Sequence, residues 1–272
     1  ARHLASMVYH NAGFDCAAAH VILTDRRWPQ RPAFLNHLRR ELARLPARPA
    51  WYPGAAERHG ELAGHYPQAE FLGPSSERGL PWTLVPDVPL REDEPALSRE
   101  AFCGLLFEAP VEGGGVRPFL DHAVAVANEH VWGNLSCVLL VDPRTARAHS
   151  QAVESAIWRL RYGCVGVNAW GGVAFGLPEL PWGAAPGNPP EDIRSGVGFV
   201  HNTHGFEHVE KGILRGPFRT AHTPPWFAGH RNLPAVGRAL CDLEAAPDWP
   251  KAFRVLAETL RGGLAPGVPG GS

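Results

Sequence analysis

Short apolar runs alternate with segments of helical periodicity through the first two thirds of the chain. Residues 20–24 form an apolar run typical of a strand, and residues 31–45 repeat apolar side chains at the spacing of an amphipathic helix. Further strands are predicted at 82–85, 104–107, 136–141 and 164–168, and further helices at 55–65, 118–130 and 145–162. This order predicts an α/β fold with a mostly parallel sheet, flanking helices and right-handed crossovers.

Two of the predicted helices have recognisable starts. Pro118 suits the first helical position, because its φ is already fixed near the helical value and its missing N–H is not needed there. Asp142 suits the N-cap of the helix predicted at 145–162, because its carboxylate can accept from free backbone N–H groups.

The last third of the chain has a different pattern. Residues 169–194 are rich in Gly, Pro and Trp and too long for a simple connector, so we expect an ordered loop that lines a site. A strand is predicted at 212–214, a Pro-rich arm at 220–227 and helices at 233–245 and 249–260, and residues 265–272 are expected to be disordered.

Composition narrows the class of protein. The chain has 272 residues, of which 44% are hydrophobic, and this is ample for a core. Its 26 Lys and Arg against 27 Asp and Glu give a net charge of −1, which indicates no nucleic-acid partner and no anionic membrane partner. The apolar runs are shorter than the about 20 residues that span a bilayer. Five scattered cysteines without CxxC pairs favour a cytoplasmic protein.

Cys16 is the first candidate for chemistry. It follows the segment Asn11-Ala12-Gly13-Phe14-Asp15 and stands just before the first predicted strand. A cysteine on a glycine-containing turn at the end of a sheet is well placed to act as a nucleophile, because the turn exposes the sulfur and frees its backbone N–H. The alternative is a small buried hydrophobic residue, which is the common role of a lone cysteine.

The segment around Cys16 resembles the catalytic-cysteine motif of the NAD(P)-dependent aldehyde dehydrogenases, F-x-N-x-G-Q-x-C-x-A. Six further segments are similar to motifs of that family and occur in the family's order. They are Glu100-Ala101-Phe102-Cys103-Gly104, Asn128 to Leu135, Gly163 to Asn168, Pro181-Trp182-Gly183, Ser195 to Gly198 and Glu210 to Leu214. The resemblance covers roughly residues 3–231 and implies the family's α/β catalytic-domain fold.

The resemblance implies a role for each matched residue. Cys16 would add to an aldehyde carbonyl, and the thiohemiacetal would lose hydride to NAD or NADP to leave a thioester that water hydrolyses to a carboxylic acid. Glu100 would accept hydrogen bonds from the nicotinamide ribose, and Phe102 would pack near the nicotinamide ring. A carboxylate can accept hydrogen bonds from two neighbouring hydroxyls, so the chemistry of Glu100 suits its implied role at the ribose.

The chain also departs from the family pattern. Phe14 stands where the family usually has Gln, and Cys103-Gly104 replaces Gly-Pro. In the family, the general-base glutamate, the side-chain oxyanion asparagine and the glycine-rich nucleotide-binding turn all precede the cysteine. We therefore expect this chain to be the catalytic part of a longer enzyme and to be inactive by itself.

The resemblance also implies a domain organisation and an assembly. We expect residues 1–210 to be a catalytic domain without its N-terminal cofactor domain, 211–232 an oligomerisation strand with a Pro-rich arm, and 233–272 a C-terminal helical extension with a disordered tail. A homodimer or a dimer of dimers is expected. A noncatalytic oligomerisation module, or a decayed homologue in which Cys16 is structural, is the alternative.

Other side chains have two interpretations each. Phe14, Trp170, Phe175 and Trp182 either line an apolar substrate pocket or belong to the core. His201, His204 and His208 fall within eight residues, but Gly205 interrupts the helix that would align them. We interpret these histidines as surface or interface residues and expect no metal site.

Overall fold

The computed structural model describes residues 1–74 and 76–264. The chain divides into two compact units, one from His3 to Phe218 and a second that begins at Arg219. The helices of the first unit are α1 (Arg2–Tyr9), the 3-10 helix η1 (His10–Gly13), α2 (Arg31–Arg44), α3 (Ala55–Gly64), α4 (Pro95–Ser98), α5 (Val116–Glu129), α6 (Pro143–Ala148), α7 (Ser150–Arg159) and α8 (Gly171–Phe175). Its strands are β1 (Val21–Asp25), β2 (Glu70–Leu72), β3 (Trp82–Val85), β4 (Leu105–Val111), β5 (Ser136–Leu139), β6 (Cys164–Val167), β7 (Trp182–Gly183), β8 (Phe199–Val200) and β9 (Gly212–Arg215).

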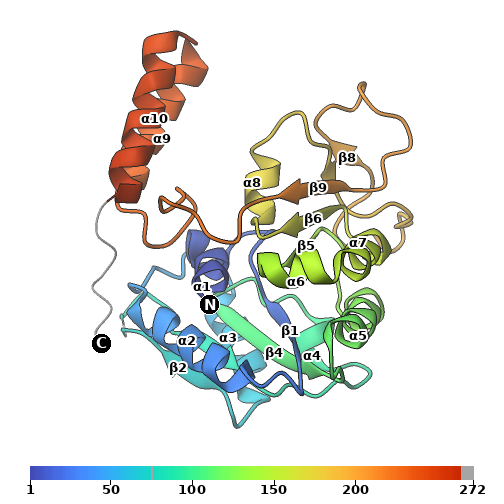
Figure 1. The fold of residues 1–272 in the computed structure, drawn as a ribbon. Helices are drawn as coiled ribbons and strands as arrows, with labels where there is room; N and C mark the ends of the chain where they lie inside the picture. The colour runs from blue at the N-terminus through green and yellow to red at the C-terminus, as the bar shows by residue number, and fades with distance from the viewer. Residues whose placement is uncertain (75, 265–272) are drawn as a thin grey trace. The chain divides into compact units, whose positions relative to one another are not determined.

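The first sheet has the strand order β1-β4-β3-β2 (Figure 1). β4 pairs in parallel with β1 and β3, and β2 pairs with β3 in the antiparallel direction. Phe107 of β4 packs in a core cluster with Leu62 of α3, whereas the next residue, Glu108, binds Arg31 of α2. Because successive strand residues point to opposite faces, α3 and α2 cover opposite faces of this sheet.

The second sheet has the order β5-β6-β9, and all of its pairings are parallel. Its core joins the sheet to α5 and α7 through Val124, Ile157, Val165 and Val167. β7 and β8 form a separate antiparallel pair. These two mainly parallel sheets with flanking helices confirm the predicted α/β class.

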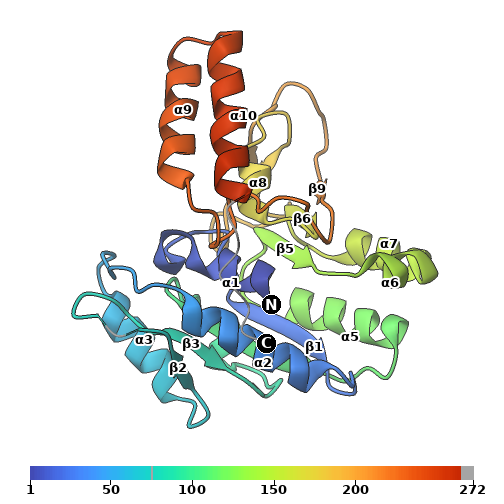
Figure 2. The same cartoon turned by 60° about the vertical axis from the view of Figure 1, so that its left-hand side comes forward.

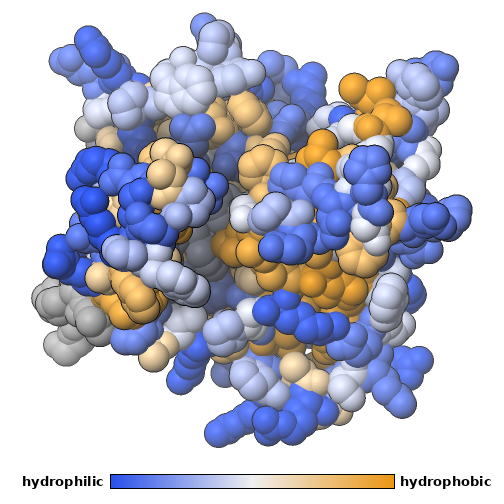
Figure 3. All heavy atoms as spheres, turned by 90° about the horizontal axis from the view of Figure 1, so that it is seen from above, coloured by the Kyte–Doolittle hydropathy of each residue, from blue (hydrophilic) through white to orange (hydrophobic). Residues whose placement is uncertain are grey.

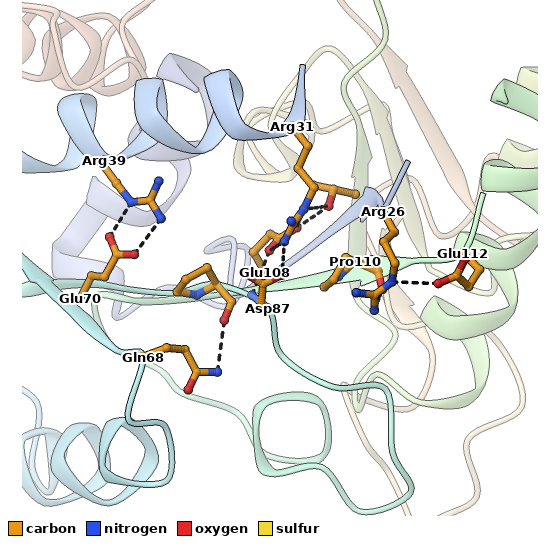
Figure 4. Close-up of polar contacts among 11 residues, drawn as sticks. Arg26, Arg31, Arg39, Gln68, Glu70, Asp87, Glu108, Pro110 and Glu112 are labelled. Atoms are coloured by element: carbon orange, nitrogen blue, oxygen red, sulfur yellow. Dashed lines mark hydrogen bonds and ion pairs between the residues drawn. The ribbon is translucent and has the colours of Figure 1, made fainter. Parts of the chain in front are cut away.

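A buried ion pair joins α2 to the first sheet (Figure 4). Glu108 is fully buried, and its carboxylate accepts from Arg31 Nε at 2.9 Å and from Arg31 Nη2 at 2.6 Å. The Thr24 hydroxyl and the backbone N–H of Asp87 also donate to Glu108. The same close-up shows a second pair, Arg26–Glu112, whose side chains are half exposed.

Two predicted boundaries are corrected by the structure. α5 begins at Val116, so Pro118 is the third residue of the helix, where a missing N–H is still harmless because the first turn has no intrahelical acceptor. The helix predicted at 145–162 is two helices, because His149 leaves helical geometry between α6 and α7. Asp142 caps α6 as predicted, accepting from the N–H groups of Arg144 and Thr145.

The second unit contains the helices α9 (Leu233–Ala245) and α10 (Trp249–Leu264), which pack side by side (Figure 2). Before α9, His230 Nε2 lies 3.0 Å from the carbonyl of Thr259, and the Asn232 amide donates to the carbonyl of Glu258 at 3.1 Å. The tail predicted to be disordered, 265–272, lies outside the described residues. Among the helices in residues 1–74 and 76–264, none has the length and apolar composition needed to cross a bilayer.

Large hydrophobic side chains are also exposed, and Figure 3 shows orange areas of this kind on one face. In the long segment after β6 they are Phe175, Leu177, Ile193, Val197, Val200 and Phe206. This segment is ordered by α8, β7 and β8, as expected for a loop of this length and composition.

Candidate active site

Cys16 follows a turn with an unusual backbone. Asn11, Ala12 and Gly13 have positive φ values of 46°, 58° and 82°. A Cβ atom on Gly13 would lie 2.5 Å from the carbonyl carbon of Cys103, so only glycine fits. The turn therefore packs directly on the backbone before β4, and it leaves Cys16 exposed.

Side chains within the turn stabilise this shape. The Asn11 amide donates to the carbonyl of Phe14 at 2.8 Å, and the backbone N–H of Ala17 donates to the Asp15 carboxylate at 2.7 Å. Trp170, in the loop that follows β6, donates its indole N–H to the carbonyl of Ala17 at 2.7 Å. The residue after Cys16 is thereby fixed on both of its backbone groups.

The electrostatic surroundings of Cys16 favour the thiol over the thiolate. Partial burial raises the pKa of Cys16, and the neighbouring Asp15 carboxylate raises it further. The backbone N–H groups of Cys16 and Ala17 act in the opposite direction, and Glu100 adds a smaller increase. The influence of Glu100 also shows that two of the sequence-predicted site residues lie near each other.

Glu100 and Phe102 lie on the segment between α4 and β4. Desolvation raises the pKa of the Glu100 carboxyl, and the Arg58 guanidinium partly offsets this increase. Among residues 1–74 and 76–264, the Glu100 carboxylate makes no hydrogen bond and no ion pair, so its oxygens are available to a ligand. Phe102 has a positive φ of 43°, which is strained for an aromatic residue.

The predicted pocket aromatics fall into separate groups. Phe14 is buried and lies 6.2 Å from Phe102, so these two predicted residues are brought together. Trp170 stacks on His10 at 4.5 Å, beside the Cys16 turn. Phe175 and Trp182 instead pair with each other at 5.6 Å.

Cavities give little further support to a pocket at Cys16. A small cavity of about 10 Å³ lies by the turn, lined by Ala12, Phe14 and Trp82 among others. A groove of about 600 Å³ lies elsewhere, along Asn134, Trp158, Arg161 and Lys211, and none of the predicted site residues lines it.

Sequence reasoning missed three residues of this site. Trp51, Tyr52 and Arg58 contact the Cys16 turn or the Glu100 segment. Two adjacent aromatic residues before Pro53-Gly54 were a possible signal, because exposed aromatics in loops often mark binding surfaces. His201 lies 5.3 Å from Phe175, and across the described parts of the chain no three His, Cys, Asp or Glu side chains come together to hold a metal ion.

Comparison with solved structures shows what this arrangement is similar to. A salicylaldehyde dehydrogenase from Pseudomonas putida G7 matches with a TM-score of 0.55 at 17% identity, over 73% of this chain and 39% of that protein. Lactaldehyde dehydrogenase from Escherichia coli matches with a TM-score of 0.55 at 19% identity, over 74% of this chain and 40% of that protein. An NAD-dependent aldehyde dehydrogenase from Sinorhizobium meliloti matches with a TM-score of 0.50 at 26% identity, over 66% and 36%.

These matches define the fold as that of the aldehyde dehydrogenases. They confirm, at the level of the fold, the family resemblance that the sequence motifs indicate. The chain spans 36–40% of the length of the three proteins named above. No protein-family model matches the sequence, and no curated protein is significantly similar to it.

Proposed function

We propose that this chain is the catalytic part of an NAD(P)-dependent aldehyde dehydrogenase that oxidises an aldehyde to a carboxylic acid, with Cys16 as the nucleophile. One observation carries the proposal. The Cys16 turn and the Glu100 segment are 84 residues apart in sequence, yet Gly13 lies directly on the backbone of Cys103. Two segments selected by family motifs thus lie against each other, on a fold shared with aldehyde dehydrogenases, and this supports the proposal.

In this proposal, Cys16 Sγ forms a bond to the aldehyde carbon, and the carbonyl oxygen takes a proton to give a thiohemiacetal. The carbon then gives up hydride and the hydroxyl group gives up its proton, which leaves a thioester on Cys16. Water hydrolyses the thioester, releases the carboxylic acid and restores the thiol. When bound, an oxidised nicotinamide dinucleotide accepts the hydride in this reaction.

The residues of the site fit such a cofactor. The Glu100 carboxylate has free acceptor oxygens, which suit two adjacent ribose hydroxyls. The aromatic side chains of Phe102 and Tyr52 lie in contact with each other, at 4.9 Å between ring centres, and offer an apolar surface to a planar ring. Solved neighbours include an enzyme described as complexed with NADP and one described as NAD-dependent, which supports NAD or NADP as the cofactor class.

The raised pKa of Cys16 adds a requirement to the proposal. The thiolate is the reactive form, and the described residues favour the thiol at neutral pH. The complete enzyme therefore needs a base or a positive charge near Cys16 that these residues do not supply. We propose that a nucleotide-binding part of the enzyme brings it, and that these 272 residues alone oxidise no aldehyde.

The same proposal includes the setting of the enzyme. All five cysteines are free, which suits a reducing cytoplasm. We propose that the intact enzyme is a homodimer or a dimer of dimers, since β9 is an edge strand of its sheet.

An activated ester tests the nucleophile without a cofactor. When p-nitrophenyl acetate reacts, Cys16 Sγ takes the acetyl group and nitrophenolate leaves. Mass spectrometry after short exposure at pH 9 is expected to show acetyl on Cys16 well before Cys241, the other exposed cysteine. The acetyl group should be lost again to water, and Cys16→Ser should abolish the adduct while Cys241→Ser leaves it unchanged.

The raised pKa of Cys16 favours one alternative, a noncatalytic homologue in which this cysteine is structural. In that case acetyl would accumulate on Cys241 as fast as on Cys16, or faster. That result would contradict the proposed function.

A further inference from the structure

A third segment of the chain contacts both the Cys16 turn and the Glu100 segment. We call residues 51–58 the bracket segment; it runs from the loop after α2 into the first turns of α3. At one end, the indole N–H of Trp51 donates to Asn11 Oδ1 at 3.2 Å. At the other end, Arg58 Nε donates to the carbonyl of Ala101 at 2.9 Å and Arg58 Nη2 to the carbonyl of Phe102 at 3.3 Å.

The contact with Asn11 acts on the geometry of the Cys16 turn. The Asn11 amide spans the turn by donating from Nδ2 to the carbonyl of Phe14 at 2.8 Å. Its other end, Oδ1, is the atom that Trp51 binds. Because an amide is planar, fixing Oδ1 also fixes the direction of Nδ2, and Trp51 thus orients the group that closes the turn.

The contact with Arg58 acts on the segment that carries Glu100. Phe102 has a positive φ of 43°, a conformation that persists only when its surroundings hold it. In the described residues, Arg58 forms no ion pair with a carboxylate. Its guanidinium instead donates to the carbonyls of Ala101 and Phe102, on either side of the strained Phe102 backbone. Hydrogen bonds from a charged donor are stronger than neutral ones and suit this purpose.

Tyr52 connects the two ends. Its ring stacks on Phe14 at 5.8 Å and meets Phe102 edge-on at 4.9 Å. The Arg58 guanidinium lies 6.0 Å from the centre of the Tyr52 ring. The Tyr52 ring therefore contacts both the Cys16 turn, through Phe14, and the Glu100 segment, through Phe102.

We propose that Trp51 and Arg58 are positioning residues that together fix the Cys16 turn against the Glu100 segment and thereby fix the surroundings of the Cys16 thiol. This inference rests on the proposed function only in taking Cys16 as the reacting group. Its test measures the environment of the thiol and requires no turnover.

The experiment compares Trp51→Phe and Arg58→Gln in the full chain. The first keeps the ring and removes the N–H, and the second removes the charge and most of the donors. Trp28→Phe and Arg44→Gln are matched controls at an exposed tryptophan and an exposed arginine away from the site. Arg58→Lys is the conservative variant. The rate of Cys16 alkylation by iodoacetamide is followed from pH 7 to pH 10 by mass spectrometry, with Cys241 as the internal reference.

We expect both variants to loosen the turn and hydrate the thiol. The midpoint of the Cys16 pH profile should fall by about half a unit, which raises the rate near neutral pH about threefold relative to Cys241. Arg58→Lys should fall between Arg58→Gln and the wild type, and both controls should match the wild type.

A Cys16 profile that stays at the wild-type midpoint in either folded variant overturns the inference, as does an equal shift in the controls. Should Arg58→Gln fail to fold, Trp51→Phe decides the result, because it removes one N–H and keeps the aromatic contacts. Failure of the proposed function would instead appear as missing acetylation of Cys16 in the wild-type chain, which this experiment does not use.

Discussion

Cys16 lies near two carboxylates, those of Asp15 and Glu100, and both raise the pKa of its thiol in addition to the effect of burial. The thiolate fraction at neutral pH is therefore smaller than for a free cysteine, whose pKa is about 8.5. We predict that alkylation of Cys16 by iodoacetamide is slow at pH 7 and accelerates with a midpoint above pH 8.5 or so. Peptide mass spectrometry over a pH series measures this midpoint, and full reactivity already at pH 7 would contradict it.

Gly13 carries a second prediction at this scale. Alanine there would have a left-handed φ of 82° and a Cβ only 2.5 Å from the Cys103 backbone. We expect Gly13→Ala to lower the free energy of unfolding by at least about 2 kcal/mol, because the left-handed conformation alone costs about 1–2 kcal/mol. Chemical denaturation measures the loss.

Gly60→Ala is the matched control for this substitution. Gly60 lies inside α3, and nothing is within 4 Å of its added Cβ. Alanine at such a helical position should stabilise the protein by about 0.5–1 kcal/mol. Equal effects of the two substitutions would show that the contact of Gly13 with Cys103 is not needed.

The sequence identifies some residues of the site and not others, for a physical reason. Cys16, Glu100 and Phe102 lie in short motifs whose spacing is local, so they can be found without a structure. Trp51 and Arg58 belong to no motif, and their partners Asn11 and Ala101 lie about 40 residues away along the chain. Contacts of that range depend on how helices and strands pack, which periodicity does not reveal.

At the scale of elements, type was easier to predict than extent. β4 runs on to Val111, four residues past the predicted end at 107, and this extension includes Glu108 and Pro110. Burial of Glu108 is possible only because Arg31 neutralises it, and Pro110 is tolerated because β3 pairs with β4 only as far as Phe107. Both explanations require knowledge of the neighbouring elements.

The buried pair in this strand gives a prediction for stability. Arg31→Met removes the partner of a fully buried carboxylate, and we expect it to lower the free energy of unfolding by about 3–5 kcal/mol. Arg26→Met, at the half-exposed pair with Glu112, should change it by about 0–1 kcal/mol. Urea denaturation of both variants measures the difference. Similar small losses in the two would mean that Glu108 is satisfied by Thr24 and Asp87 alone.

At the scale of the whole molecule, the question is assembly. Within the described residues, β9 is at the edge of its sheet, and the N–H groups of Gly212 and Gly216 point toward the strand β6 side. The N–H of Arg215 therefore faces the open edge of the sheet. A proline at this position would leave β9 paired with β6, but it would remove the N–H that a strand of another chain needs for pairing. Ile213 is a poorer choice for a test, because its side chain packs on the core of its own sheet.

We predict that Arg215→Pro weakens self-association of the chain, whereas Arg215→Gln does not. Both substitutions remove the ion pair of Arg215 with Glu154, so this pair cancels in the comparison. Light scattering over a concentration series measures the mass of each variant. A wild-type chain that remains monomeric, or equal association of the two variants, would remove β9 as an interface.

The parallel pairing of β1 with β4 has a consequence for the nascent chain during synthesis. Cys16 precedes β1 and Glu100 precedes β4, so the site exists only after two segments 84 residues apart have met. At a synthesis speed of about 5–20 residues per second, roughly 4–17 s pass between the appearance of Cys16 and that of Glu100. Throughout that interval the cysteine is an ordinary thiol on an unfolded segment, without the burial that later raises its pKa. An oxidant can therefore reach Cys16 as an ordinary thiol before the chain has folded.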